Sequence, residues 1–138
     1  MAPEPGSPTH LFVYGTLRPG EVRWHFLEPF VVDEGVDTTV PGEVFDTGLD
    51  YPAAMFREPA GSQCGIAGSG FIRGRVYELV AHRHDEALAA LDEVEGAVRG
   101  LYHRVVVHTA SGHEAWAYEC GDESLLVRRL ESGDWLDR

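Results

Sequence analysis

The chain has 138 residues, 43% of them hydrophobic and 10% aromatic, which is enough for one ordinary domain with a buried core. Eleven basic residues against 23 acidic ones give a formal net charge of −12, which disfavours binding to nucleic acid or to an anionic membrane. Every basic residue is arginine, so the lysine-dependent chemistry of Schiff bases and Walker-A phosphate loops is excluded.

The first eight residues contain three prolines, a glycine and an acid, which predicts a flexible tail over residues 1–9 and a single domain over 10–138. They lack the basic start and apolar stretch of a signal peptide, and no apolar run of the chain is long enough to cross a bilayer. We therefore expect a cytoplasmic protein that does not contact membranes.

Short apolar runs bounded by Gly, Asp and Pro predict strands. The first covers residues 10–14 and ends at Gly15, and the others cover 30–32, 40–45, 51–56, 71–80, 101–109 and 113–120. The tripeptide Ala110-Ser111-Gly112 joins the last two as a hairpin. The glycine-rich stretch 57–70 predicts a loop, and its GxxGxG order before a strand is not a dinucleotide-binding fingerprint.

Three segments predict helices. Residues 21–27 allow two turns before Pro29. A clearer helix has Asp85 as its N-cap, Gly96 beyond its C-terminus and an apolar stripe of Ala87, Leu88, Leu91 and Val94. Residues 123–130 predict a last helix with Leu126 and Leu130 inward. The fold class is therefore α+β: a small, mostly antiparallel β-barrel or curled sheet flanked by two to three helices.

The turn Tyr14-Gly15-Thr16-Leu17-Arg18 follows the first strand directly. A glycine there lets successive N–H groups point outward and bind a carboxylate or phosphate oxygen. The alternative is that the turn is a plain exit from the strand.

Three carboxylates, Asp92, Glu93 and Glu95, crowd the end of the clearest helix, just before Gly96. The helix dipole and the like charges both disfavour ionisation there, so one carboxyl is a candidate general acid/base. The alternative is a solvated acidic helix end. Tyr102 and Arg104 lie two residues apart on the next predicted strand and so share one of its faces. They could line the same cavity as Glu95. The alternative is that Tyr102 is a half-buried core residue and Arg104 a surface partner for an acid. For Trp116 and Tyr118 we expect core packing.

The chain offers little for a metal ion. Two-residue spacing in a helix makes His82 and His84 diverge, and the other histidines are scattered along the hairpin. Cys64 and Cys120 are far apart and in no CxxC pair, which argues against a structural zinc site or a disulfide scaffold. We expect neither a metal nor a cofactor.

Seven motifs in this order resemble the γ-glutamylcyclotransferase-like family, in its γ-glutamylamine cyclotransferase and AIG2-like branch. They are VYGTLRPG (13–20), YPAA (51–54), GRVYEL (74–79), LDEVEG (91–96), LYHR (101–104), AWAY (115–118) and SGDW (132–135). The resemblance covers nearly the whole chain after the tail. It implies a small β-barrel flanked by helices and an enzyme that needs no cofactor.

The activity that this resemblance implies is release of 5-oxoproline and an amine or amino acid from a small γ-glutamyl compound. The family's catalytic acid/base glutamate falls on Glu95, and its substrate loop falls on Tyr14, Gly15, Thr16 and Leu17. Arg18, Tyr102 and Arg104 complete the expected substrate-binding set. Two alternatives stay open: a non-catalytic module that binds a small carboxylate metabolite or a partner, and a biosynthetic cyclotransferase that removes a γ-glutamyl protecting group.

Overall fold

The computed structural model describes residues 8–15, 24–48, 52–56, 70–94, 102–120 and 123–135. The α-helices in these residues are α1 (Trp24–Leu27) and α2 (His84–Val94), and the 3-10 turns are η1 (Glu28–Phe30), η2 (Ala81–Arg83) and η4 (Glu123–Leu125). The strands are β1 (His10–Val13), β2 (Val36–Asp46), β3 (Pro52–Phe56), β4 (Phe71–Glu78), β5 (Tyr102–His108), β6 (Glu114–Cys120) and β7 (Arg128–Arg129).

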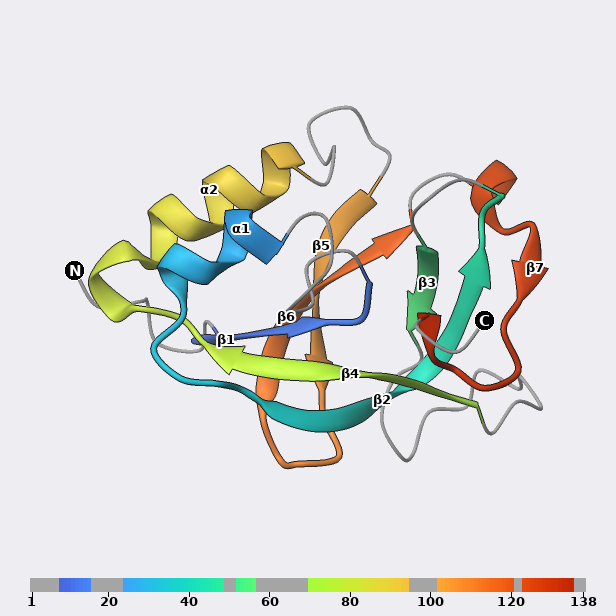
Figure 1. Ribbon diagram of the computed structural model, residues 1–138, viewed down its shortest axis with the longest axis horizontal. Coiled ribbons are helices and arrows are strands. Elements are labelled where there is room, and N and C mark those ends of the chain that lie inside the picture. The colour runs from blue at the N-terminus through green and yellow to red at the C-terminus, as the bar shows by residue number, and fades with distance from the viewer. Residues whose placement is uncertain are drawn as a thin grey trace.

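The strands form one strongly curved sheet in the order β3-β2-β4-β1-β6-β5, with β7 beside β2 (Figure 1). The ladder between β1 and β6 is parallel, and the ladders from β1 to β4, β2 to β3, β2 to β4, β2 to β7 and β5 to β6 are antiparallel. Because β3 lies against β6, the sheet is a nearly closed barrel. The expected α+β fold, a small and mostly antiparallel barrel flanked by helices, is confirmed.

Glu119 on β6 joins the two ends of the sheet. One carboxylate oxygen, Oε2, accepts the backbone N–H of Phe56 at the end of β3, at 2.9 Å. The other, Oε1, lies 2.9 Å from Nε2 of His103 on β5. The side chain is 17% exposed. This partly buried carboxylate therefore links β3 to β5 at the place where the barrel closes, which we call the barrel seam.

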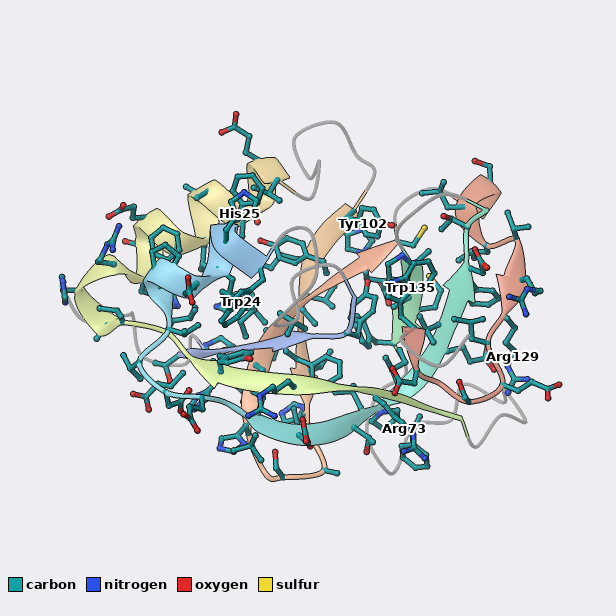
Figure 2. The ribbon with its side chains drawn as sticks, in the orientation of Figure 1. Trp24, His25, Arg73, Tyr102, Arg129 and Trp135 are labelled. Atoms are coloured by element: carbon teal, nitrogen blue, oxygen red, sulfur yellow. The ribbon has the colours of Figure 1, made fainter. Side chains whose placement is uncertain are left out.

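Alternation along the strands produces two hydrophobic cores, one on each face of the sheet. Between the sheet and the helices lie Leu11 and Val13 of β1 with the buried stripe of α2, Ala87, Leu88 and Leu91. Phe12 and Tyr14 belong to the other core, inside the barrel. Trp135, labelled in Figure 2, packs in the same core. The end of β1 therefore touches both cores.

Most predicted elements are present, with three corrections. Residues 30–32 are not a strand: Phe30 closes η1, and Val31 makes one isolated bridge to Leu79. The α-helix α1 ends at Leu27, before Pro29, as predicted, and Pro29 lies in the first positions of the following 3-10 turn, where its missing N–H is not needed. Helix α2 begins at His84 after η2, so Asp85 lies inside the first turn and is not the N-cap.

The predicted C-terminal helix over 123–130 is wrong. Only the 3-10 turn η4 forms there, and the chain then extends as β7. Pairing with β2 decides this, since Phe45 and Asp46 are opposite Arg129 and Arg128, and Leu130 donates its N–H to the carbonyl of Val44 at 2.8 Å. Leu130 is buried as expected. The predicted loop over 57–70 lies outside the described residues except for Gly70, and Gly96 also lies outside them.

Candidate active site

Four of the predicted site residues lie in the described part of the chain, and they gather where β1 ends and β5 begins. Tyr14 and Gly15 follow β1. Tyr102 opens β5 opposite Cys120 (Figure 2), and Arg104 lies two residues further along. Thr16, Leu17, Arg18 and Glu95 lie outside the described residues.

Gly15 is placed against the first residue of β3. A Cβ atom on Gly15 would lie 2.5 Å from Cγ and 2.8 Å from Cδ of Pro52. The carbonyl oxygen of Pro52 in turn accepts the phenol of Tyr102 at 2.6 Å. Since Gly15 does not have a positive φ, glycine is required here for close packing and not for a left-handed conformation. The structure thus brings Gly15 and Tyr102 together around Pro52.

Tyr14 and Tyr118 connect the end of β1 to helix α2. The buried phenol of Tyr14 donates to the backbone carbonyl of Tyr118 at 2.6 Å. The phenol of Tyr118 donates to Oδ1 of Asp92, on the last turn of α2, at 2.7 Å. Tyr118 is a core residue, as predicted, and it also makes a polar link that the alternating pattern of β6 does not predict.

Arg104 faces the same helix from β5. Its Nε lies 3.3 Å from Oδ1 of Asp92, which is ion-pair distance, although Nε makes no hydrogen bond within the described residues. Its guanidinium carbon lies 4.7 Å from the centroid of the Trp116 ring, a cation–π arrangement. With 26% of its side chain exposed, Arg104 is both an ion-pair partner for an acid and accessible at the edge of the cluster.

Helix α1 adds an aromatic residue to this side of the sheet. Trp24 packs against the core between sheet and helices, and its ring centroid lies 5.3 Å from that of Tyr77. Burial raises the pKa of the Tyr77 phenol, whose hydroxyl makes no hydrogen bond within the described residues. Tyr77 is therefore a buried, uncharged core residue at ordinary pH.

Sequence reasoning missed two residues of this cluster. In the sequence, Pro52 belongs to the YPAA motif without a role of its own, and Asp92 is one of three carboxylates at the acidic helix end, of which Glu95 is the expected acid/base. A signal for Asp92 exists in the register of the hairpin, since Arg104 is directly opposite Tyr118 and both reach the same carboxylate. That register can be counted from the turn at Ala110-Ser111-Gly112, but the docking of α2 on the hairpin cannot.

Other groupings do not join this cluster. His84 is buried with Nε2 2.9 Å from the carbonyl oxygen of Pro8, and Nδ1 is 3.4 Å from Asp85. Among the described residues, no three His, Cys, Asp or Glu side chains are grouped to hold a metal ion.

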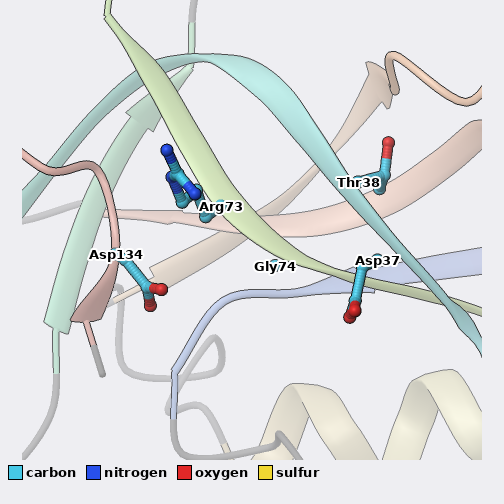
Figure 3. Close-up of a pocket in the computed structure, with 5 residues that line it drawn as sticks. All are labelled: Asp37, Thr38, Arg73, Gly74 and Asp134. Atoms are coloured by element: carbon cyan, nitrogen blue, oxygen red, sulfur yellow. The ribbon is translucent and has the colours of Figure 1, made fainter. Parts of the chain in front are cut away.

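A separate polar pocket of about 220 Å³ is lined by Asp37, Thr38, Arg73, Gly74 and Asp134 (Figure 3). It shares no residue with the predicted site. Within the described segments, no helix is long and apolar enough to cross a membrane.

Relatives of this chain were found by sequence. A profile of the family described as "Gamma-glutamyl cyclotransferase, AIG2-like" matches residues 11–137. The gamma-glutamylcyclotransferase family protein YtfP of Escherichia coli strain K12 is 30% identical over 130 residues, which cover 93% of this chain and 96% of YtfP. The gamma-L-glutamyl-butirosin B gamma-glutamyl cyclotransferase of Niallia circulans is 27% identical over 134 residues, covering 91% of this chain and 74% of that protein.

Solved structures share the fold. An uncharacterized protein of Pyrococcus horikoshii superposes with a TM-score of 0.68 at 23% identity, covering 94% of this chain and 91% of the other. An AIG2-like protein of Mus musculus superposes with a TM-score of 0.59 at 19% identity, covering 92% of this chain and 88% of the other. Because the family profile spans nearly the whole sequence, this chain belongs to the AIG2-like γ-glutamyl cyclotransferase family.

Proposed function

We propose that this protein is a cofactor-independent γ-glutamyl cyclotransferase that converts a small γ-glutamyl compound into 5-oxoproline and a free amine or amino acid. The α-amino nitrogen of the substrate attacks its own γ-carbonyl carbon and closes a five-membered ring. The bond from that carbon to the leaving nitrogen breaks, and one proton passes from the attacking nitrogen to the leaving one. No water is consumed.

Glu95 is the general acid/base of this proposal. It follows Val94, the last residue of α2, by sequence. The α-amino group attacks as the neutral amine, and one carboxylate can take the proton that this nitrogen loses and pass it to the leaving nitrogen. Because nucleophile and carbonyl belong to one molecule, the remaining task is to hold the folded substrate, which we assign to Tyr14, Gly15, Thr16, Leu17, Arg18, Tyr102 and Arg104.

The single observation that best supports this function is the linked position of three elements. The end of β1, the last turn of α2 and the start of β5 meet through Tyr14, Tyr118, Asp92 and Arg104. The proposed substrate loop follows the first of these elements and the proposed acid/base follows the second. Family membership supports the reaction class. The junction of the three elements supports the choice of the loop after β1 and of Glu95 as the site residues.

A biosynthetic role is the second candidate, because the Niallia circulans relative is named for a γ-glutamyl-butirosin substrate. A panel of γ-glutamyl amines, γ-glutamyl dipeptides and γ-glutamyl-butirosin B distinguishes the possibilities. We expect 5-oxoproline release from at least one of the three kinds of compound, and preference for γ-glutamyl-butirosin B would favour the biosynthetic role. Saturable binding of γ-glutamyl compounds without 5-oxoproline release from any of them would instead indicate a non-catalytic binding module.

A further inference from the structure

One carboxylate oxygen connects three elements of the candidate site. Oδ1 of Asp92 accepts the phenol of Tyr118 at 2.7 Å and lies 3.3 Å from Nε of Arg104. The backbone carbonyl of Tyr118 accepts the phenol of Tyr14 at 2.6 Å. A single residue of β6 therefore receives a hydrogen bond from the end of β1 and gives one to the last turn of α2.

The two tyrosines that make these hydrogen bonds are buried. Tyr14 and Tyr118 are 7% and 3% exposed, so little water competes for their hydroxyl groups. The side chain of Asp92 is 25% exposed and is held from two sides, by a hydroxyl and by a guanidinium. Glu93, the next residue on the helix, is exposed. Two adjacent carboxylates of one helical turn thus have different surroundings.

We propose that Asp92 is a positioning residue that holds, through Tyr118, the last turn of α2 in register with Tyr14 and Gly15. This inference rests on the proposed function, since its effect on turnover is the alignment of Glu95, which follows α2 in sequence, with the substrate loop. It goes beyond that function because Asp92 itself neither touches substrate nor exchanges a proton. A displacement of about 1 Å between reacting groups costs about a hundredfold in rate.

The test compares Asp92→Ala with Tyr118→Phe, each of which removes one partner of the same hydrogen bond. For a substrate that the wild type turns over, we expect kcat to fall about 10- to 100-fold in each variant, with KM changed less than about threefold. The double variant should be no slower than the slower single variant, because Asp92→Ala already breaks the hydrogen bond that Tyr118→Phe removes. Asp92→Asn keeps an acceptor for Tyr118 and should recover much of the loss.

Glu93→Ala is the matched control, because it removes the same charge from the neighbouring position of the same helix. We expect it to keep wild-type kcat. Wild-type kcat in Asp92→Ala, or losses that multiply in the double variant, would overturn the proposal. Thermal unfolding of each variant separates these effects from loss of the folded protein, and the nearly isosteric Tyr118→Phe carries the test if Asp92→Ala does not fold.

A second readout does not depend on catalysis. In amide NMR spectra without ligand, the Gly15 resonance should move in Asp92→Ala and in Tyr118→Phe and stay in place in Glu93→Ala. If the wild type releases no 5-oxoproline from any compound, the proposed function fails while this resonance still decides the positioning role. An unmoved Gly15 resonance in Asp92→Ala would show that α2 and the end of β1 are not coupled.

Discussion

Gly15 lies so close to Pro52 that a Cβ atom on it would be 2.5 Å from the proline Cγ. Any side chain at this position must push the start of β3 aside, and Pro52 also carries the carbonyl that Tyr102 binds. The glycine of the YGTL motif is therefore part of the packing of three strands as well as of the proposed substrate loop.

We predict that Gly15→Ala lowers the free energy of unfolding by about 1–3 kcal/mol, which is the usual cost of overpacking a filled site. Gly15→Val should cost more and should also abolish binding of a γ-glutamyl compound. Denaturant unfolding and a binding titration measure the two effects. Pro52→Ala removes the atoms that the new Cβ meets, so Gly15→Ala should cost less in that background. Equal costs in both backgrounds would mean that the Pro52 ring is not the obstacle.

We predict that Glu95→Gln reduces turnover of a verified substrate by about two to four orders of magnitude while binding stays near wild type. Glutamine keeps the size and hydrogen-bonding reach of the side chain but cannot exchange a proton. The control is Glu93→Gln on exposed α2 surface, which should keep most of the activity. Wild-type turnover in Glu95→Gln would make this carboxylate a solvated helix end and refute the mechanism.

The pH dependence of the wild-type rate gives a related expectation. A helix C-terminus and neighbouring carboxylates both disfavour the charged form of an acid. The rate should therefore show an ionisation above the ordinary glutamate pKa of about 4.3, and Glu95→Gln should lack it. A profile that is the same in both proteins would assign the ionisation to another group.

The barrel seam gives a stability prediction. Glu119→Ala leaves the N–H of Phe56 without the carboxylate that it binds, and we expect the free energy of unfolding to fall by about 1–3 kcal/mol. Glu114 lies on the same strand, where it forms an exposed pair with His108 at 3.3 Å, and Glu114→Ala should cost less than about 1 kcal/mol. Chemical denaturation of both variants measures the difference. Similar small costs would show that the carboxylate does not close the barrel.

Acid should destabilise the protein through His10. Burial first, and then the neighbouring His113 ring at 4.7 Å, lower the pKa of His10 below 6.5, while Glu78 and Asp33 act in the opposite direction. Below about pH 6.5 the unfolded chain therefore binds more protons at this residue than the folded protein does, and stability is lost as the pH falls further. When the free energy of unfolding is measured across this pH range, its dependence on pH should be weaker in His10→Gln than in the wild type. His113→Gln should weaken that dependence in part. An unchanged slope in His10→Gln would contradict the shift.

What could be predicted from the sequence was set by local patterns. The run before Gly15, the hairpin around Gly112 and the apolar stripe of α2 each carry their own periodicity, and each is present in the structure. Residues 123–130 also have a helical pattern, but Arg128 and Arg129 pair with β2 as a short antiparallel strand. The two arginines also form ion pairs with acidic residues of β2, Arg128 with Asp46 and Arg129 with Glu43. A distant strand therefore outweighed local propensity.

The candidate site shows the same division. Tyr14, Gly15, Tyr102 and Arg104 could be chosen from their motifs because each lies next to a strand end. Their actual partners, Pro52 and Asp92, are brought in by other elements and have no short-range signature. The substrate-binding roles of Tyr14, Gly15, Tyr102 and Arg104 stay predictions, as do the roles of Thr16, Leu17, Arg18 and Glu95.

The parallel pairing of β1 with β6 delays the folding of β1 during synthesis. β1 lies between β4 and β6, and the hydrogen bond that fixes Tyr14 spans 104 positions of the chain. During synthesis β1 leaves the ribosome first and its neighbour β4 follows, yet its other neighbour, β6, becomes available only when Cys120, the last residue of that strand, has emerged. The 104 positions from Tyr14 to Tyr118 must thus be translated before the end of β1 can take its place, so nascent chains arrested before residue 118 should not acquire the protease resistance of the 138-residue chain.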